Sequence, residues 1–338
     1  MKRVSRFFSR ALMGCYVLGI FAIVLLLSLH LTSVQALAGA CSDTSQAALK
    51  SCQEGAASDY WLAIGKCDNV SSTDKQTCLT QAKADKQSAL EDCKAQFDAR
   101  QEICKELGGG PYLAGGIDPL QFSSDPEGND YFPLSEATYR YKSFDQNGNV
   151  IEKDKVKVTG GTRTIIGVTC RAVRDTVTDP DGNVTEDTTD WYAQSINGDV
   201  WYFGEIAQQF ITEDGKPILV GIEGSWTAGV EGAKPGIIMF AHPQNDVGRT
   251  YREEFALGDA EDVSKVIEVG LRLTDLPDLP NIPNKVKNQL PKGPYVHTQD
   301  FSALEPGVVE DKYYAKGVGL VLTIAPDGTE ILVSITKP

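Results

Sequence analysis

The pattern of hydrophobic and polar positions changes character twice along the chain. An uncharged apolar run covers residues 11–34, and two stretches with helical composition follow at 43–66 and 75–107. From residue 129 onward, short β-rich runs alternate with turns. We therefore predict an α+β protein, in which an antiparallel helical hairpin precedes a mostly antiparallel β domain shaped as an open curved sheet or partial barrel.

Six cysteines in the helical stretches follow one another at intervals of 11, 15, 11, 15 and 11 residues. Because these steps are close to whole numbers of turns, each helix carries its cysteines along one stripe. If the chain reverses at Ser72 and Thr73, antiparallel partners have residue numbers that add up to 145. All six cysteines satisfy that sum, which predicts three disulfides: Cys41–Cys104, Cys52–Cys93 and Cys67–Cys78.

Other uses of cysteine fit this spacing less well. Zinc sites favour C-x2-C pairs, haem attachment needs C-x-x-C-H and redox catalysis needs C-x-x-C, and none of these occurs. Helices joined this closely need small residues between the rungs, and Ala56 falls opposite Ala89 and Ala63 opposite Ala82. The hairpin is therefore expected to be structural or to bind a partner. A further cysteine, Cys170, is expected to be buried and unpaired.

The first 38 residues have the order of a secretion signal. Four basic residues precede the apolar run, and Ala36-Leu37-Ala38 provides a small-residue cleavage site. The run is also long enough to be an uncleaved membrane anchor. These features, with the paired cysteines, predict an exported protein in the periplasm, at the cell surface or outside the cell.

Composition argues against several classes of function. The net charge of −14 repels phosphate backbones, so we expect no nucleic-acid partner. The chain has no H-E-x-x-H, G-x-S-x-G, Walker or dinucleotide-binding motif, and we predict no cofactor. A Ser/His/Asp triad stays open, since its members need not be close in sequence.

The patterns divide the chain into four parts. Residues 1–38 are the signal or anchor, 41–107 the hairpin, 108–121 a linker rich in Gly and Pro, and 122–338 the β domain. Five prolines at 275–294 exclude a central strand there and predict a loop. Beyond the three hairpins described next, strands are expected at 217–223, 236–241, 249–256, 265–274, 308–315, 318–324 and 329–335.

Three similar sequences, at 145–149, 179–183 and 195–199, are typical of type I turns closed by Gly, each joining two strands. Calcium loops of the EF type place their Gly at position six, whereas here it is fourth, so we predict plain turns. The second turn places Asp175 opposite Asp187, and this carboxylate pair is the one candidate for a metal site. Other expected pairs are Lys142–Glu152, Arg140–Asp154, Trp191–Phe203, Tyr192–Tyr202 and Ala193–Trp201, while a shorter third turn would pair Asp190 with Glu205.

Short motifs between residues 129 and 338 form a recognisable set: Tyr131–Leu134, Asp190–Gln194, Val200–Glu205, Gly224–Trp226, Pro235–Met239, Tyr251–Arg252, Leu304–Glu310 and Tyr313–Tyr314. With these motifs the β part resembles an uncharacterised family of secreted bacterial proteins. The resemblance implies a secreted β domain and no established activity. The helical hairpin and the Pro-rich loop are not part of the family's pattern.

The best candidate for a binding cleft is the region 190–252, where aromatic residues and glycines are concentrated. Such residues suit an apolar ligand, with a few polar side chains as anchors. The alternative is that the aromatics fill the sheet core and the glycines make turns. The candidate residues are Trp191, Trp201, Phe203, Glu205, Trp226, Glu231, Tyr251 and Arg252.

Two functions are compatible with the sequence. In the first, a non-enzymatic exported module binds an apolar or lipid-like small molecule, or an envelope or extracellular protein, with the hairpin as a rigid docking arm. In the second, a secreted hydrolase or cation-dependent enzyme uses paired carboxylates, either Asp175 with Asp187 or Asp190 with Glu205. A membrane partner is expected only if residues 1–38 are retained.

Overall fold

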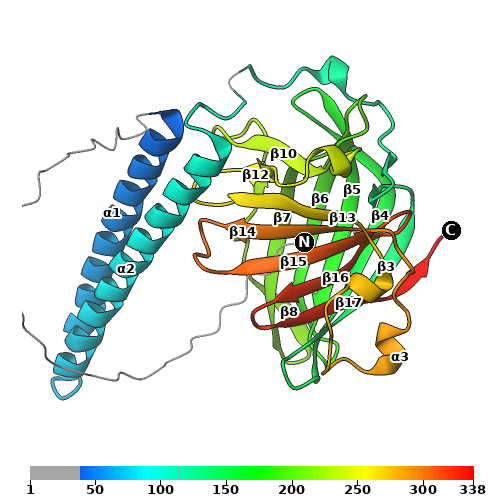
Figure 1. The fold of residues 1–338 in the computed structure, drawn as a ribbon. Coiled ribbons are helices and arrows are strands. Elements are labelled where there is room, and N and C mark those ends of the chain that lie inside the picture. The colour runs from blue at the N-terminus through cyan, green and yellow to red at the C-terminus, as the bar shows by residue number, and fades with distance from the viewer. Residues whose placement is uncertain (1–38, 114) are drawn as a thin grey trace, which may run out of the picture.

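The computed structural model describes residues 39–113 and 115–338 (Figure 1), so the predicted signal or anchor at 1–38 lies outside the described residues. The described part is α+β, with a helical hairpin followed by a nearly closed antiparallel sheet, as the sequence predicts. Within it, we find no helix with the length and apolar character needed to cross a membrane.

The hairpin consists of α1 (Ala40–Asp68) and α2 (Lys75–Leu107). Disulfides join Cys41 to Cys104, Cys52 to Cys93 and Cys67 to Cys78, with Cα–Cα distances of 5.8, 5.7 and 5.5 Å, and these are the pairs that the cysteine spacing predicts. The helices approach this closely because alanines, including the buried Ala56 and Ala82, lie between the rungs. The disulfides take the place of a hydrophobic core, which two helices alone are too small to build.

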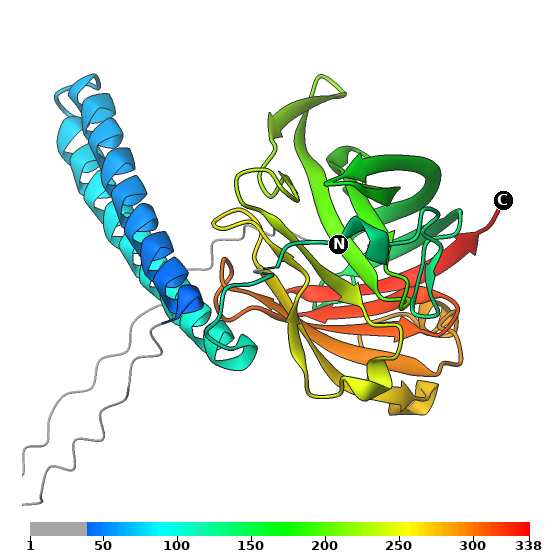
Figure 2. The same cartoon turned by 90° about the horizontal axis from the view of Figure 1, so that it is seen from above.

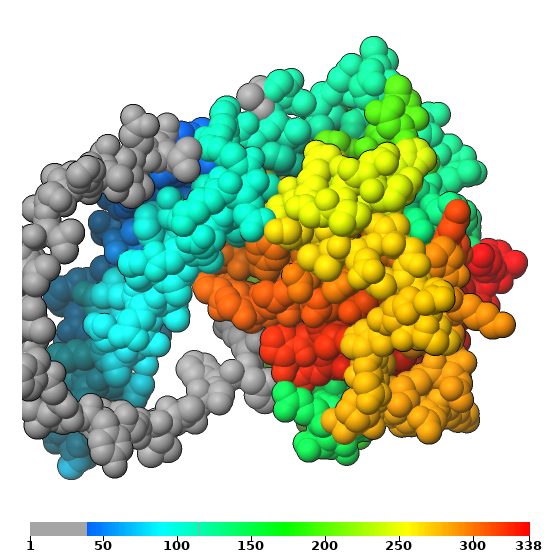
Figure 3. Space-filling model, in the orientation of Figure 1, coloured from blue at the N-terminus to red at the C-terminus, as the bar shows by residue number. Residues whose placement is uncertain are grey.

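The hairpin contacts the β domain at one end only. Figure 2 shows it leaning away from the sheet, and in Figure 3 its surface meets that of the β domain near the end where α1 begins and α2 ends. The turn at the opposite end, residues 69–74, lies far from the sheet (Figure 1). The last turns of α2 therefore carry the contact between the two parts.

One antiparallel sheet forms most of the β domain, in the strand order β11-β13-β14-β15-β16-β17-β3-β4-β5-β6-β7-β10-β12, with β8 and β9 paired to β7. The strands are β3 (Ala137–Phe144), β4 (Val150–Ile165), β5 (Val168–Thr178), β6 (Val184–Gln194), β7 (Val200–Glu213), β8 (Lys216–Gly221), β9 (Trp226–Thr227), β10 (Lys234–Met239), β11 (Thr250–Arg252), β12 (Glu254–Phe255), β13 (Asp262–Leu271), β14 (Tyr295–Ser302), β15 (Val309–Ala315), β16 (Gly319–Ala325) and β17 (Gly328–Thr336). A separate pair, β1 (Gly128–Asn129) and β2 (Phe132–Pro133), precedes them.

The two ends of this strand order meet in one short segment of the chain. β11 pairs with β13 at one edge, and β12 pairs with β10 at the other. Only Glu253 separates β11 from β12, and its backbone N–H donates to the Asp262 carbonyl at 2.9 Å. Because one segment bonds to both edges, the sheet curls into a nearly closed barrel.

Large apolar side chains fill the inside of this curled sheet. Tyr295, Phe203, Leu134, Met239 and Leu322 are among the largest side chains that are fully buried. The Pro-rich loop adds to the core, because its Leu279, Ile282 and Leu290 are buried in the same cluster. This loop holds the short helix α3 (Asn284–Lys287), and 3-10 turns occur at Pro119–Gln121, Pro243–Asn245 and Leu273–Asp275. Cys170 is buried and forms no disulfide with any described cysteine, as expected.

All three predicted turns close as expected, with backbone N–H···O bonds of 2.9–3.0 Å between residues 145 and 149, 179 and 183, and 195 and 199. In each hairpin, however, the register shifts by one residue beyond the turn. Each hairpin contains a β-bulge, in which one residue has no residue opposite it on the neighbouring strand. These residues are Ile151 in the first hairpin, Thr185 in the second and Phe203 in the third. The extra residue rotates the following side chains to the other face of the strand.

The bulges overturn several predicted pairs. Lys142 faces Lys153 and Arg140 faces Lys155, so the expected Lys142–Glu152 and Arg140–Asp154 pairs do not form. In the third hairpin Tyr192–Tyr202 and Ala193–Trp201 form as predicted, but Trp191 faces Gly204 instead of Phe203. Beyond this bulge Asp190 faces Glu205, even though the turn is the longer form.

The predicted pairing of Asp175 with Asp187, the candidate metal site, is also wrong. The bulge at Thr185 pairs Asp175 with Thr188 and Asp187 with Thr176, so the two carboxylates lie on opposite faces of the sheet. Asp187 forms an ion pair with Arg174 on its own face. The described residues contain no cluster of His, Cys, Asp or Glu side chains suited to a metal ion.

The sequence pattern does not predict β14 (Tyr295–Ser302). Its inward positions include Thr298 and Asp300, which are polar yet buried, so the run lacks the apolar alternation that marks a strand. Buried polar residues of this kind also occur on neighbouring strands, among them Lys312 on β15 and Thr323 on β16.

The ladder predicts a local effect of removing one rung. Replacing Cys52 and Cys93 together by Ala should lower the local stability of the hairpin by about 2–4 kcal/mol, because the open chain gains conformational freedom. Hydrogen exchange should accelerate across α1 and α2 and stay unchanged in the β domain. Cys170→Ala, which removes no disulfide, is the control and should leave exchange in the hairpin as it is. Equal exchange in the double variant and the wild type would contradict the prediction.

Candidate functional site

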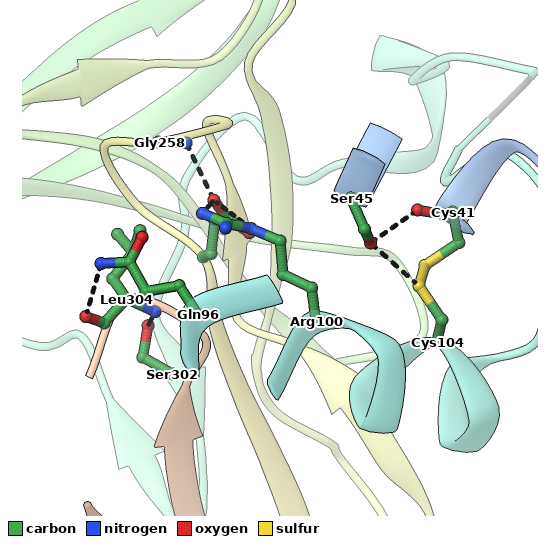
Figure 4. Close-up of polar contacts among 9 residues, drawn as sticks. Cys41, Ser45, Gln96, Arg100, Cys104, Gly258, Ser302 and Leu304 are labelled. Carbon is green, nitrogen blue, oxygen red and sulfur yellow. Dashed lines mark hydrogen bonds and ion pairs between the residues drawn. A yellow bond between two sulfur atoms is a disulfide. The ribbon is translucent and has the colours of Figure 1, made fainter. Parts of the chain in front are cut away.

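A buried ion pair fastens the hairpin to the β domain (Figure 4). Arg100 of α2 donates to Glu261 through Nη2 to Oε1 at 2.7 Å and through Nε to Oε2 at 2.9 Å. The backbone N–H of Gly258 also donates to Oε1, at 2.8 Å. The two side chains are only 6% and 2% exposed, so this bidentate pair is shielded from water.

Further contacts surround the ion pair. Ile103 of α2 packs against Val263 and Ala303 in a small buried cluster. Glu106 accepts from Thr250 and from Lys265, the latter at 3.1 Å, and these hydrogen bonds lower the pKa of its carboxyl group. The joint therefore combines apolar packing with several charged contacts.

The linker after α2 is docked on the β domain through Tyr112. Its hydroxyl donates to the Pro235 carbonyl at 2.9 Å, and its own carbonyl accepts from Lys234 Nζ. Its ring packs edge-on against Phe255, with 6.1 Å between centroids. Tyr112 thereby fixes the linker in the space between the hairpin and the sheet.

A cavity of about 710 Å³ lies at this joint. It is lined by the last turns of α2, the start of α1, the linker and strands β7, β10, β11 and β12. The sequence candidates Trp201, Tyr251 and Arg252 all line it. The structure thus brings these three together, and it adds lining residues that sequence reasoning missed: Ile103, Leu107, Tyr112, Lys234, Ile237 and Phe255.

Arg252 has unusual surroundings in this cavity wall. Its guanidinium lies over the ring of Phe255, at 4.5 Å from the centroid, and at 5.7 Å from that of Tyr112. The residue is 8% exposed, and burial lowers the pKa of its side chain. Its Nη1 is buried and has no hydrogen-bond partner among the described residues. Trp201, another lining residue, has a buried Nε1 that also lacks a hydrogen-bond partner among the described residues.

The remaining sequence candidates lie elsewhere. Trp191, Phe203, Glu205 and Trp226 are buried in the sheet, where the aromatic rings belong to the hydrophobic core. Glu231 is exposed in the turn between β9 and β10. For these five positions the core-and-turn interpretation describes the structure better than a shared cleft.

Asp190 and Glu205 form a buried carboxylate pair across β6 and β7. They are 5% and 4% exposed, and neither lines the cavity. The Tyr202 hydroxyl donates to Asp190 Oδ1 at 2.6 Å. Burial and the adjacent charge of Glu205 raise the pKa of Asp190 to about 8, so this carboxyl group is largely protonated at neutral pH.

A second buried polar cluster, which sequence reasoning missed, lies near the closing segment. Lys312 Nζ is 2.6 Å from Asp300 Oδ2 and 3.4 Å from Glu310 Oε2. Burial and the charge of Asp300 raise the pKa of Glu253 well above its ordinary value. This shift favours the neutral form of Glu253, while the charges of Asp300 and Glu310 favour the charged form of Lys312.

The ion pair at the joint predicts a measurable cost of breaking it. Arg100→Met leaves the Glu261 carboxylate buried without its cation and should destabilise the joint by about 3–5 kcal/mol. Hydrogen exchange of residues 258–263 and of the end of α2 should accelerate. Lys94→Met, which breaks an exposed ion pair with Asp98 on the same helix, is the control. Similar exchange in both variants would show that the buried pair does not hold the joint.

The buried carboxyl pair predicts pH dependence of the β domain. Since the pKa of Asp190 is raised from about 4 in the unfolded chain to about 8 in the fold, stability should fall as pH rises between these values. Asp190→Asn should flatten this dependence and be more stable than the wild type at pH 9 by about 1–3 kcal/mol. Denaturant unfolding at pH 5, 7 and 9 measures this. Asp187→Asn, on the opposite face, should keep the wild-type slope, and an unchanged slope in Asp190→Asn would refute the assignment.

No protein-family model and no curated protein matches this sequence, so the family resemblance of residues 129–338 stays a prediction. Among solved structures, a protein of Bacteroides fragilis that is taken to be exported and has a YmcC-like fold aligns with a TM-score of 0.32 and 9% identity, over 62% of this chain and all of that one. A protein of Parabacteroides distasonis taken to be a lipoprotein aligns with a TM-score of 0.28 and 11% identity, over 62% of this chain and 99% of that one. TM-scores this low assign neither a fold nor a function to the present chain.

Proposed function

We propose that this protein is a non-enzymatic extracytoplasmic binding module, and that the cavity at the hairpin joint holds a largely apolar small molecule. The observation that carries the proposal is the cavity itself. Its volume of about 710 Å³ lies within the range of about 300–1,000 Å³ that is usual for small-molecule sites. The three disulfides support a location outside the cytoplasm, where such bonds persist.

The character of the walls supports an apolar ligand. Side chains of Ile103, Leu107, Ile237 and Phe255 come from α2, β10 and β12, and they surround the space together with Tyr112. An apolar ligand gains roughly 25 cal/mol for each Å² of its surface that these side chains remove from water. Hairpin, linker and sheet all contribute, so the site depends on the two parts of the protein being joined.

The enzymatic alternative has less support. A hydrolase or cation-dependent enzyme needs carboxylates that reach the substrate, whereas Asp190 and Glu205 are almost inaccessible and Asp175 and Asp187 lie on opposite faces. A general acid or base must come within hydrogen-bonding distance of the substrate. The buried carboxyl groups act instead on the stability of the sheet.

Filling the cavity tests the proposal. Ile237→Trp places a larger side chain in the cavity and should weaken binding of the neutral apolar fluorophore N-phenyl-1-naphthylamine at least tenfold, measured by its fluorescence enhancement. Ile196→Trp makes the same change at an isoleucine that is 63% exposed in a turn. This control should bind the fluorophore like the wild type. Equal binding by the wild type and Ile237→Trp would refute the cavity as the site.

A further inference from the structure

We infer that the ligand of this cavity is an amphiphile with an oxyanion head group, a carboxylate or a phosphate, held by Arg252. This inference rests on the proposed function and names the chemistry of its ligand. It starts from the charges that line the cavity, which include four cationic side chains and only two carboxylates: Arg100, Lys234, Arg249, Arg252, Glu106 and Glu261.

The two carboxylates are already engaged by other groups. Glu261 receives Arg100 on both oxygens and the Gly258 N–H as well. Glu106 accepts from Thr250 and Lys265. Each carboxylate therefore has its own cationic partner, and neither is left to neutralise the remaining cations of the cavity.

Arg252 and Lys234 are the cations without a carboxylate partner. No carboxylate of the described residues forms an ion pair with either of them, and Glu261, which acts on Arg252 from a distance, has its oxygens occupied. Within residues 39–113 and 115–338, Lys234 Nζ donates to the neutral carbonyl of Tyr112 alone. A guanidinium that is buried against aromatic rings with one nitrogen unsatisfied carries a desolvation cost that an anion would offset.

The unpartnered polar atoms of the cavity residues are also all donors. Arg252 Nη1 and Trp201 Nε1 are buried and lack an acceptor among the described residues. Guanidinium and indole nitrogens only donate, whereas ionised carboxylates and phosphates offer several acceptor lone pairs. An oxyanion beside the Arg252 guanidinium therefore suits this wall, and a cationic head group would be repelled by Arg252 and Lys234.

The apolar part of the ligand follows from the rest of the lining. Ile103, Leu107, Ile237 and Leu257 lie around the same cavity as Arg252 and present hydrocarbon side chains. A small inorganic anion would leave these surfaces without contact. A chain or ring system bearing one anionic group uses both kinds of wall.

Four probes with the same dodecyl chain and different heads test the head group. Dodecanoate, dodecyl phosphate, dodecanol and dodecyltrimethylammonium are compared at pH 8, below their micelle concentrations, by displacement of N-phenyl-1-naphthylamine from the full chain. Either anion should bind about 10- to 100-fold tighter than dodecanol, the range expected for hydrogen bonds to a charged group. The tighter of the two anions identifies the head. Ile237→Trp, which keeps the N-terminal apolar run, corrects for binding outside the cavity.

Arg252→Gln should remove the preference for anions and leave the affinity for dodecanol within about twofold, whereas Arg252→Lys should keep part of the preference. Dodecanol binding as tightly as both anions, or an undiminished anion preference in a folded Arg252→Gln, would overturn the inference and leave the proposed function standing. Failure of N-phenyl-1-naphthylamine to bind the wild type would overturn the proposed function itself. If Arg252→Gln does not fold, the comparison of the four heads on the wild type decides alone.

Discussion

The closure of the sheet by residues 250–255 is the constraint on which the rest of the structure depends. This segment bonds to β13 through one half and to β10 through the other, so it joins two edges that would otherwise stay open. Successive side chains of this segment point to opposite faces of the sheet and lie in different surroundings. Arg252 faces the cavity at the joint, and Glu253 is buried beside the Asp300–Lys312 cluster. One short segment that contains β11 and β12 thus sets both the shape of the β domain and the position of its candidate site.

The hairpin and the sheet stabilise each other at one place. The disulfides hold α1 and α2 together without help from the β domain, but they do not determine where the hairpin lies. That is the role of Arg100, whose partner Glu261 belongs to the turn between β12 and β13, immediately after the closing segment. Barrel closure and hairpin attachment therefore share a short stretch of chain, and the cavity lies beside it.

Some features of the fold can be predicted from the sequence and others cannot, for physical reasons that particular residues illustrate. The cysteine ladder was predictable because helical geometry is rigid, so a spacing of 11 and 15 residues leaves one consistent pairing. The bulges at Ile151, Thr185 and Phe203 were not predictable, because no particular residue type marks the position of an inserted residue. They reversed the faces of the strands and paired Asp190 with Glu205. The sequence pointed to Trp201, Tyr251 and Arg252 because aromatic and charged residues cluster in this region. It could not identify the hairpin residues of the same cavity, because they lie far away in sequence. Arg100 and Glu261, for example, are 161 positions apart.

The attachment of the hairpin by one end gives it the mechanics of a lever. α1 has 29 residues, which corresponds to roughly 43 Å of helix from its start at the joint to the turn at the far end. A rotation of about 10° at the joint would move the far end by roughly 7 Å on this geometry. The cavity lies beside this attachment, so the same rotation would change the spacing between its hairpin wall and its sheet wall.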